Sequence, residues 1–383
     1  MRSLPYWRLS AFYFLYFSAL GSLLPYWNLY LESLGFNAVQ IGQLAAVMVG
    51  TKIVAPNIWG WIADQSGRRL SLIRSASLMA SLAFLAMLLD TGFIWMASVT
   101  LVFSFFWNAS LPQFEAVTLS YLKSDPYGYS QVRVWGSIGF VVTVIGVGWL
   151  LESLDISVLP LVVALLMWGI WVASMLVPRE QVSGSESAAS GLGVILRKTE
   201  VIAFLIVSCL VQLAHGPYYV FYSIFLEHHG YSHGQIGQLW SLGVIAEVML
   251  FFSMHRCLAR FSLRVILLAS IMAGVLRWIL IAFFADHLPT LIFAQVLHAA
   301  TFGSMHVAAI HLIHAYFPSG SHGRGQALYS SMSFGLGGML GSLVSGTLWD
   351  ELGARQVFCG ASAVCLLALV IAWVWVRTNE GED

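Results

Sequence analysis

Charged residues are scarce in this sequence: only 9% of its 383 residues are Asp, Glu, Lys or Arg. A soluble domain carries about 25% charged residues. Here 59% of the residues are hydrophobic and the mean hydropathy is +0.81, so most of the surface is expected to face lipid. The formal net charge is zero, and no basic field favours nucleic acid as a partner.

Residues for metal, cofactor or enzyme chemistry are also few. The four cysteines have no zinc-type spacing and are interpreted as packing residues. His306 and His311 are five apart and point in different directions on a helix, so they make a poor metal pair. No G-x-x-x-x-G-K-[ST] motif is present. We expect no metal, no cofactor and no enzymatic activity; the alternative that remains is an intramembrane enzyme or a non-transporting receptor.

Long apolar runs dominate the chain, and twelve of them are long enough to span a bilayer as helices. They lie at 9–31, 39–62, 70–89, 93–121, 132–151, 157–177, 201–226, 235–254, 264–284, 289–314, 324–348 and 356–376. One polar, Ser- and Gly-rich stretch interrupts the series and is typical of a flexible linker. The sequence therefore predicts a six-helix bundle at 1–178, a cytoplasmic linker at 179–198 and a second six-helix bundle at 199–383.

The distribution of Lys and Arg predicts the orientation in the membrane. Of 18 such residues, 15 fall on one side of the twelve spans, Arg355 falls on the other, and Lys52 and Arg277 lie within spans. Because cations are retained on the cytoplasmic side, both termini are expected in the cytoplasm.

An internal repeat relates the two halves. Residues 31–44 recur at 226–239, with eight of fourteen positions identical at an offset of 195. The same offset relates Gly21 to Gly216 and Gly146 to Gly341. Both copies follow the first span of a half, so the halves are predicted to have the same topology. Duplicated six-helix halves with a solute site between them are one common transporter plan. Convergent loop composition is the alternative.

The loop after the second span carries a recognisable motif, Gly60-x-x-x-Asp64-x-x-Gly67-Arg68-Arg69. It resembles the signature of the major facilitator superfamily. Glycine lets helices approach closely, and Asp64 can cap a helix or pair with an arginine. An ordinary cytoplasmic turn is the alternative. The resemblance implies an all-α membrane protein with twelve transmembrane helices in two pseudo-symmetric bundles, working by alternating access.

Four titratable residues of the second half lie deep in their spans. At about 1.5 Å per residue, Glu247, Arg277, His298 and His215 lie roughly 11 to 18 Å from the periplasmic ends of their helices. Ionisable residues inside the membrane are costly and are functional candidates. Glu247 and Arg277 have opposite charges, so pairing would offset part of their desolvation; a purely structural ion pair is the alternative.

Polar residues also mark two further faces. In the fourth span Asn108 and Glu115 are seven apart and share a face, and Arg133 follows near the start of the fifth span. A carboxylate and a guanidinium on adjacent helices can grip a ligand, or can form a simple salt bridge. The seventh span carries a polar and aromatic stripe of Gln212, His215, Tyr219 and Tyr222. The tenth span carries a second stripe of Gln295, His298, Phe302 and His306.

Glu115 with Arg133, and Glu247, Arg277 and His298, resemble the sugar-binding and proton-coupling residues of the lactose permease branch. Thr301 stands where that branch has its proton-carrying glutamate, so the proton site does not transfer directly. Other sequence segments, such as Val132-Arg133-Val-Trp-Gly, more closely resemble the bacterial 3-phenylpropionate permease branch.

The resemblance implies a proton-coupled symporter of a small organic solute in the bacterial inner membrane. Substrate binding is expected at Glu115, Arg133, His215, Tyr219 and Asn108. Proton coupling is expected at Glu247, Arg277, His298 and His306. The leading solute is an aromatic acid such as 3-phenylpropionate; the alternative is an oligosaccharide or a nucleoside, and efflux is a further possibility. Protons, the solute and the bilayer are the expected partners of a monomer.

Overall fold

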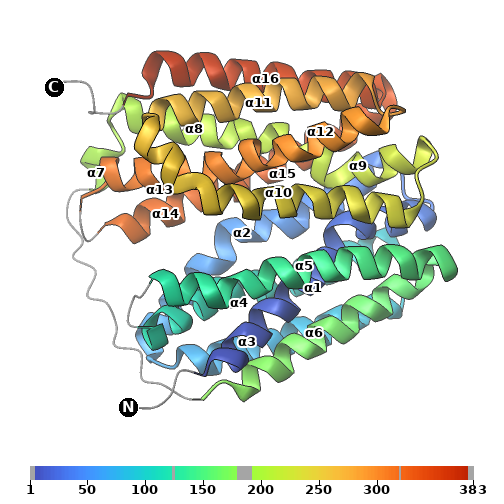
Figure 1. The fold of residues 1–383 in the computed structure, drawn as a ribbon. Coiled ribbons are helices and arrows are strands. Elements are labelled where there is room, and N and C mark those ends of the chain that lie inside the picture. Colours follow the sequence, from blue (N-terminus) through green and yellow to red (C-terminus); the bar gives the residue numbers. More distant parts are fainter. Residues whose placement is uncertain (1–4, 123–125, 179–191, 319–320, 378–383) are drawn as a thin grey trace. The chain divides into compact units, whose positions relative to one another are not determined.

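The computed structural model describes residues 5–122, 126–178, 192–318 and 321–377. These residues contain helices and no strand, and twelve helical segments are long and apolar enough to cross a membrane (Figure 1). The predicted all-α architecture of a multi-pass membrane protein is therefore confirmed. The chain ends and most of the predicted linker, at 179–191, lie outside the described residues, so the cytoplasmic placement of the termini and the linker stay predictions.

The described helices form two compact units. The first contains residues 5–178 together with 230–241, and the second contains 192–229 together with 242–377. The helices of the first unit are α1 (Tyr6–Ser33), α2 (Ala38–Ser66), α3 (Arg69–Leu85), η1 (Ala86–Leu88), α4 (Phe93–Leu122), α5 (Pro126–Ser153), η2 (Ile156–Val158) and α6 (Leu159–Leu176).

Glycines bring the helices of the first unit into close contact. α1 packs against α5 and α6, and α4 packs against α2 and α3. A Cβ atom on Gly139 of α5 would lie 2.2 Å from the Phe14 carbonyl oxygen of α1, and one on Gly21 of α1 would lie 2.8 Å from the Phe140 carbonyl oxygen. Small residues at such crossings let the backbones approach, which is how helices associate in lipid.

The second unit repeats this arrangement with interrupted helices. Its elements are α7 (Leu192–Ile195), α8 (Thr199–Ala214), α9 (Gly216–His228), α10 (His233–Arg260), α11 (Leu263–Phe283), α12 (Leu288–His298), the π-helical η3 (Ala299–Ser304), α13 (Met305–Tyr316), α14 (His322–Ser330), the π-helical η4 (Ser331–Gly337), α15 (Gly338–Leu352) and α16 (Ala354–Trp375). α16 packs on α8 and α11 (Figure 1), and α8 packs on η4. A Cβ atom on Gly337 would lie 2.4 Å from the Cys209 carbonyl oxygen.

The sequence repeat reappears as repeated contacts inside the two units. Tyr121 Oη donates to the Pro178 carbonyl oxygen at 2.7 Å, and Tyr316 Oη donates to the Arg377 carbonyl oxygen at 2.8 Å. These tyrosines are related by the offset of 195 that the sequence repeat shows. Each one ties the end of the fourth span of its half to the residues after the sixth span, so the duplication extends to particular hydrogen bonds.

Residues 230–241 group with the first unit because the end of α5 holds them. The Glu152 carboxylate accepts hydrogen bonds from Ser232 Oγ at 2.6 Å and from the Gly234 amide at 3.2 Å. A carboxylate is favourable at the start of a helix such as α10, where backbone amides are unpaired. The first nine residues of α10 thus belong with the first unit. The domain boundaries expected from the sequence stay a prediction.

Candidate functional site

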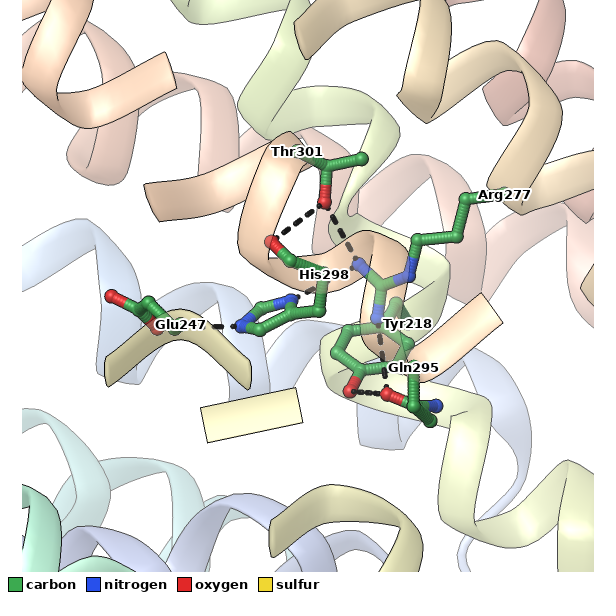
Figure 2. Close-up of polar contacts among 6 residues, drawn as sticks. All are labelled: Tyr218, Glu247, Arg277, Gln295, His298 and Thr301. Atoms are coloured by element: carbon green, nitrogen blue, oxygen red, sulfur yellow. Dashed lines mark hydrogen bonds and ion pairs between the residues drawn. The ribbon is translucent and has the colours of Figure 1, made fainter. Parts of the chain in front are cut away.

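A buried arginine lies at the centre of a polar cluster in the second unit. Arg277 of α11 is 0% exposed. Its Nη1 donates to Thr301 Oγ1 at 3.2 Å and lies 3.1 Å from His298 Nδ1, and its Nη2 donates to Gln295 Oε1 at 3.3 Å (Figure 2). The guanidinium carbon lies 4.2 Å from the centre of the Tyr218 ring. Neutral acceptors and an aromatic face therefore surround this cation.

His298 connects Arg277 to a carboxylate. A guanidinium has only donors, so His298 Nδ1 must accept the bond from Arg277, and a neutral ring then carries its proton on Nε2. That nitrogen lies 3.8 Å from Glu247 Oε2 of α10 (Figure 2). The assignment follows from the bonding pattern. It orients the N–H of the imidazole toward the carboxylate and its lone pair toward the guanidinium.

The direct pairing of Glu247 with Arg277 that the sequence suggested is not what the structure has. The ring of His298 lies between their charged groups and contacts both of them (Figure 2). Depth along a helix places residues in the same membrane layer, but it does not give their order within that layer. The structure brings these three residues of the predicted layer together, in a line of Glu247, His298 and Arg277.

Thr301 holds the position at which the resemblance would place a glutamate. It lies in η3, accepts from Arg277, and donates to the His298 carbonyl oxygen at 3.2 Å. Gly303 of the same segment lies against Glu247, since a Cβ atom there would be 3.1 Å from Glu247 Cγ. π-helical segments are frequent at functional sites. In this helix the π segment supplies a neutral acceptor for Arg277 and room for the carboxylate of α10.

His215 lies at the break between α8 and α9 and is fully buried. Its Nδ1 is 2.7 Å from the Val211 carbonyl oxygen, and its ring stacks on Tyr219 at 5.8 Å and meets Trp278 edge-on at 4.9 Å. Among the described residues, His215 Nε2 has no hydrogen-bond partner. The ring therefore packs beside the cluster of Arg277 through Trp278, and its predicted contact with substrate stays a prediction.

His306 lies two turns beyond His298 in an aromatic stack. Phe302 is parallel to both rings, 5.5 Å from His298 and 6.5 Å from His306, with interplanar angles of 11°. Tyr329 and Phe334 also contact His306, at 6.0 and 6.2 Å. The predicted shared face of these side chains is present, and these ring contacts give His306 aromatic neighbours on several sides. The coupling role of His306 stays a prediction.

A second cluster, within the first unit, contains the other predicted pair. Arg133 Nε of α5 lies 3.9 Å from Glu115 Oε1 of α4, and both side chains are about one-third exposed. Tyr129 Oη donates to Glu115 Oε1 at 3.4 Å. The Arg133 guanidinium carbon is 4.0 Å from the centre of the Phe17 ring. Gly136 leaves room for it, because a Cβ atom there would lie 2.7 Å from Arg133 Nη1.

The guanidinium of Arg133 is loosely held. None of the described residues accepts a hydrogen bond from it, and the separation from Glu115 is near the limit for an ion pair. An arginine presents five donors in a fixed planar arrangement that matches a carboxylate. Arg133 can therefore bind an anionic group without first breaking a hydrogen bond within the described part of the protein.

Asn108 is apart from this pair and links two helices. Its Nδ2 donates to the Met48 carbonyl oxygen at 3.1 Å and to Thr51 Oγ1 at 2.8 Å, both on α2. The side chain is 5% exposed. Both amide protons are thus used between α4 and α2, so the structure does not bring Asn108 together with Glu115 and Arg133, and its predicted contact with substrate is unsupported by this geometry.

The motif at residues 60–69 forms the turn between α2 and α3. Gly67 ends α2 with φ of 62°, in the left-handed region that favours glycine. Asp64 forms an ion pair with Arg69 at the start of α3. Arg68 is the residue before α3, and Gly60 lies beside Gln113 of α4. Each motif residue thus has a packing or turn role that suits a tight helix connection.

Several residues of both clusters are not evident from sequence. Tyr218 follows Pro217 on a different face from the predicted stripe of His215 and Tyr219, yet its ring lies against Arg277. Tyr129 and Phe17 surround the Glu115–Arg133 pair. Their only signal is the aromatic character of these spans. Among the described residues, no group of three or more His, Cys, Asp or Glu is placed to hold a metal ion.

Comparison with known proteins places this geometry in a family. The model of the MFS_1 like family matches residues 6–359. The chain is 32% identical over 369 residues to the probable 3-phenylpropionic acid transporter of Escherichia coli (strain K12), covering 94% of this chain and 95% of that protein. It is 25% identical to the maltose permease of Geobacillus stearothermophilus, covering 97% of this chain and 95% of that permease.

A solved structure supports the same fold. The crystal structure of the nucleoside transporter NupG superposes with a TM-score of 0.86 at 17% identity, covering 99% of this chain and 100% of that chain. Identity this low bears on the fold alone. The same family is indicated by the two six-span halves, by the motif at residues 60–69, by the family match and by the phenylpropionic acid relative. The chain belongs to the MFS_1 like family, and the protein is a transporter of the major facilitator type.

Proposed function

We propose that the protein is a proton-coupled symporter that takes up a small organic acid, in particular an aromatic monocarboxylate such as 3-phenylpropionate. The proposal draws on the relative that is named as a probable 3-phenylpropionic acid transporter. It places the protein in a bacterial inner membrane with both termini in the cytoplasm, as the 15-to-1 division of Lys and Arg between the sides of the spans favours.

The observation that carries the coupling is the line of Glu247, His298 and Arg277 in the second unit. With Glu247 ionised, the carboxylate balances the guanidinium across the imidazole. Protonation of Glu247 removes that balance and leaves Arg277 as an uncompensated cation inside the membrane, which is costly. A bound organic anion restores the net charge that the protein has when Glu247 is ionised. Proton and anion are therefore bound more favourably together than separately, which is the condition for symport.

Arg133 is the proposed contact for the carboxylate of the solute. It has donors unused by the described residues and a side chain that is 30% exposed. Phe17 and Tyr13 lie 4.0 and 5.6 Å from its guanidinium and add aromatic surface. A planar guanidinium next to aromatic rings suits a ligand that combines a carboxylate with a ring. Glu115 opposes Arg133 and limits binding to solutes that displace it or hydrogen-bond to it.

A second candidate solute is an oligosaccharide. Glu115 next to Arg133 offers an acceptor and donors for hydroxyl groups, and one relative is a maltose permease. This reading predicts binding that does not depend on a carboxylate. The first candidate predicts that neutral sugars do not bind at all.

Purified protein in proteoliposomes tests the proposal. With an inward proton gradient, labelled 3-phenylpropionate should accumulate above its external concentration, faster than in protein-free liposomes, and a protonophore should abolish the accumulation. Unlabelled 3-phenylpropionate should compete and maltose should not. Equal accumulation with and without the gradient would contradict coupling, and competition by maltose would favour the second candidate.

A further inference from the structure

An apolar groove runs between α11 and α16 on the surface of the second unit. It is an open groove with a volume of about 500 Å³ and is lined by apolar side chains throughout, among them Val265, Ala269 and Met272 of α11 and Leu369 and Trp373 of α16. Both helices are membrane spans, and Val265, Ala269 and Met272 are exposed. The volume is in the range of ligand sites, and the lining offers no polar partner to an organic acid or a sugar.

A cation lies at one end of the groove, where α11 begins and α16 ends. Arg264 precedes Val265, donates from Nη2 to the Trp373 carbonyl oxygen, and has its guanidinium carbon 5.5 Å from the Trp373 ring. Within the described residues, its Nε is buried without a hydrogen-bond partner, and none of the ion pairs of this part of the chain includes Arg264. This arginine thus combines a fixed position with unused donors at a helix N-terminus.

The first unit provides a comparison, because another arginine there contacts the end of the last span of that half. Arg74 of α3 donates to the carbonyl oxygens of Ser174 at 3.2 Å, Met175 at 3.3 Å and Val177 at 2.7 Å, at the end of α6. Each arginine therefore caps the last span of its own half. Arg74 makes three such bonds whereas Arg264 makes one, so capping of the last span occupies fewer of the five donors of Arg264 than of Arg74.

We propose that the groove and Arg264 form a site for an anionic phospholipid, with one acyl chain along α11 and α16 and the phosphate at Arg264. An acyl chain matches the apolar lining and its exposure on membrane spans. A phosphate matches the guanidinium of Arg264, which has no carboxylate partner among the described residues, since arginine binds phosphate through two parallel hydrogen bonds. Basic pockets between membrane helices bind anionic headgroups in this way. The site is distinct from the clusters of Arg277 and Arg133 and does not depend on the solute.

Native mass spectrometry of the purified full-length protein tests the site. The protein is titrated with palmitoyl-oleoyl phosphatidylglycerol and, separately, with phosphatidylcholine that has the same chains. Phosphatidylglycerol should bind more tightly. Arg264→Gln should weaken its binding about fivefold, the effect of one cation near an anionic headgroup, while Arg264→Lys should retain most of it. Inorganic phosphate, which lacks the chain, should not compete.

A pair of alanine variants tests the groove itself. Ala269→Phe fills the groove from the lipid side and should weaken phosphatidylglycerol binding without unfolding the protein. Ala363→Phe is the matched control, because Ala363 is also exposed on α16 but does not line the groove; it should bind as the wild type does. Equal affinity for the two lipids, an unchanged affinity in Arg264→Gln, or equal effects of the two phenylalanines would overturn the proposal.

Discussion

Each unit contains an arginine within or near a membrane span, and the two arginines have different surroundings. Arg277 is 0% exposed and contacts His298, Thr301 and Gln295 through its terminal nitrogens. Arg133 has a side chain that is 30% exposed and a carboxylate at 3.9 Å. The first cation is fixed in a network, whereas the second retains donors that the described residues leave unused. This difference is why we propose a charge-balancing role for Arg277 and a ligand-binding role for Arg133.

The internal repeat sharpens this contrast. The packing contacts recur in both units, as Tyr121 and Tyr316 show. The charged clusters do not recur: at the offset of 195, Arg133 corresponds to Leu328 and Glu247 corresponds to Lys52. The shared contacts therefore belong to the scaffold of each six-span half. The residues that differ between the halves are the ones to which we assign transport.

Removing Arg277 should have the largest effect. Arg277→Gln removes the cation from the line of Glu247, His298 and Arg277. Removing one partner of a buried charged network costs about 3–5 kcal/mol, equivalent to more than a hundredfold. We expect gradient-driven uptake to fall at least that far in proteoliposomes that contain equal amounts of folded protein. Arg277→Lys keeps the charge but not the planar contacts, so its uptake rate should lie between those of the wild type and Arg277→Gln. Uptake at the wild-type rate in Arg277→Gln would remove the charge-balance argument.

Replacing Arg133 should weaken binding while leaving the second unit intact. A hydrogen bond to a charged group contributes about 1.5–3 kcal/mol, so Arg133→Gln should raise the Kd for 3-phenylpropionate about tenfold to a hundredfold. The Kd is measured by the ligand-dependent rise in Tm. Arg133→Lys should recover part of the affinity. If the Kd does not change, the carboxylate of the solute binds elsewhere.

Replacing Asn108 should have the smallest effect. Asn108→Ala removes a hydrogen-bonding side chain between α4 and α2, and such bonds contribute about 0.6 kcal/mol in membrane proteins. We expect a slightly lower Tm and an unchanged Kd. A tenfold rise in Kd with an unchanged Tm would instead support the substrate contact that the sequence suggested for this residue.

The sequence was sufficient to predict the spans and to bring Glu247, Arg277 and His298 together as candidates. Twelve long apolar runs and a repeated segment predicted the helices, because hydropathy reports directly on burial in lipid. Spacing along the helices also placed Glu247, Arg277 and His298 at one level. These features depend only on the number of residues between positions, which can be read directly from the sequence.

Contacts between helices could not be obtained in this way. Sequence spacing did not reveal that His298 separates Glu247 from Arg277, or that Asn108 turns to α2, because both depend on which helix is the neighbour. Hydropathy also does not detect the break at His215 or the π segment that contains Thr301, since their residues remain apolar enough to span. Tyr218 was missed for the same reason: its partner comes from α11.

Substrate-driven proton movement in Glu247→Gln tests the central claim most directly. A pH-sensitive dye is enclosed in proteoliposomes without an imposed gradient, 3-phenylpropionate is added outside, and the signal of protein-free liposomes is subtracted because the neutral acid crosses lipid unaided. The wild type should acidify the lumen above this background. Glu247→Gln should bind the solute at least as tightly as the wild type, because Gln mimics the protonated carboxyl, and it should add no acidification. Acidification by Glu247→Gln at the wild-type rate would contradict the assignment of proton coupling to Glu247, His298 and Arg277.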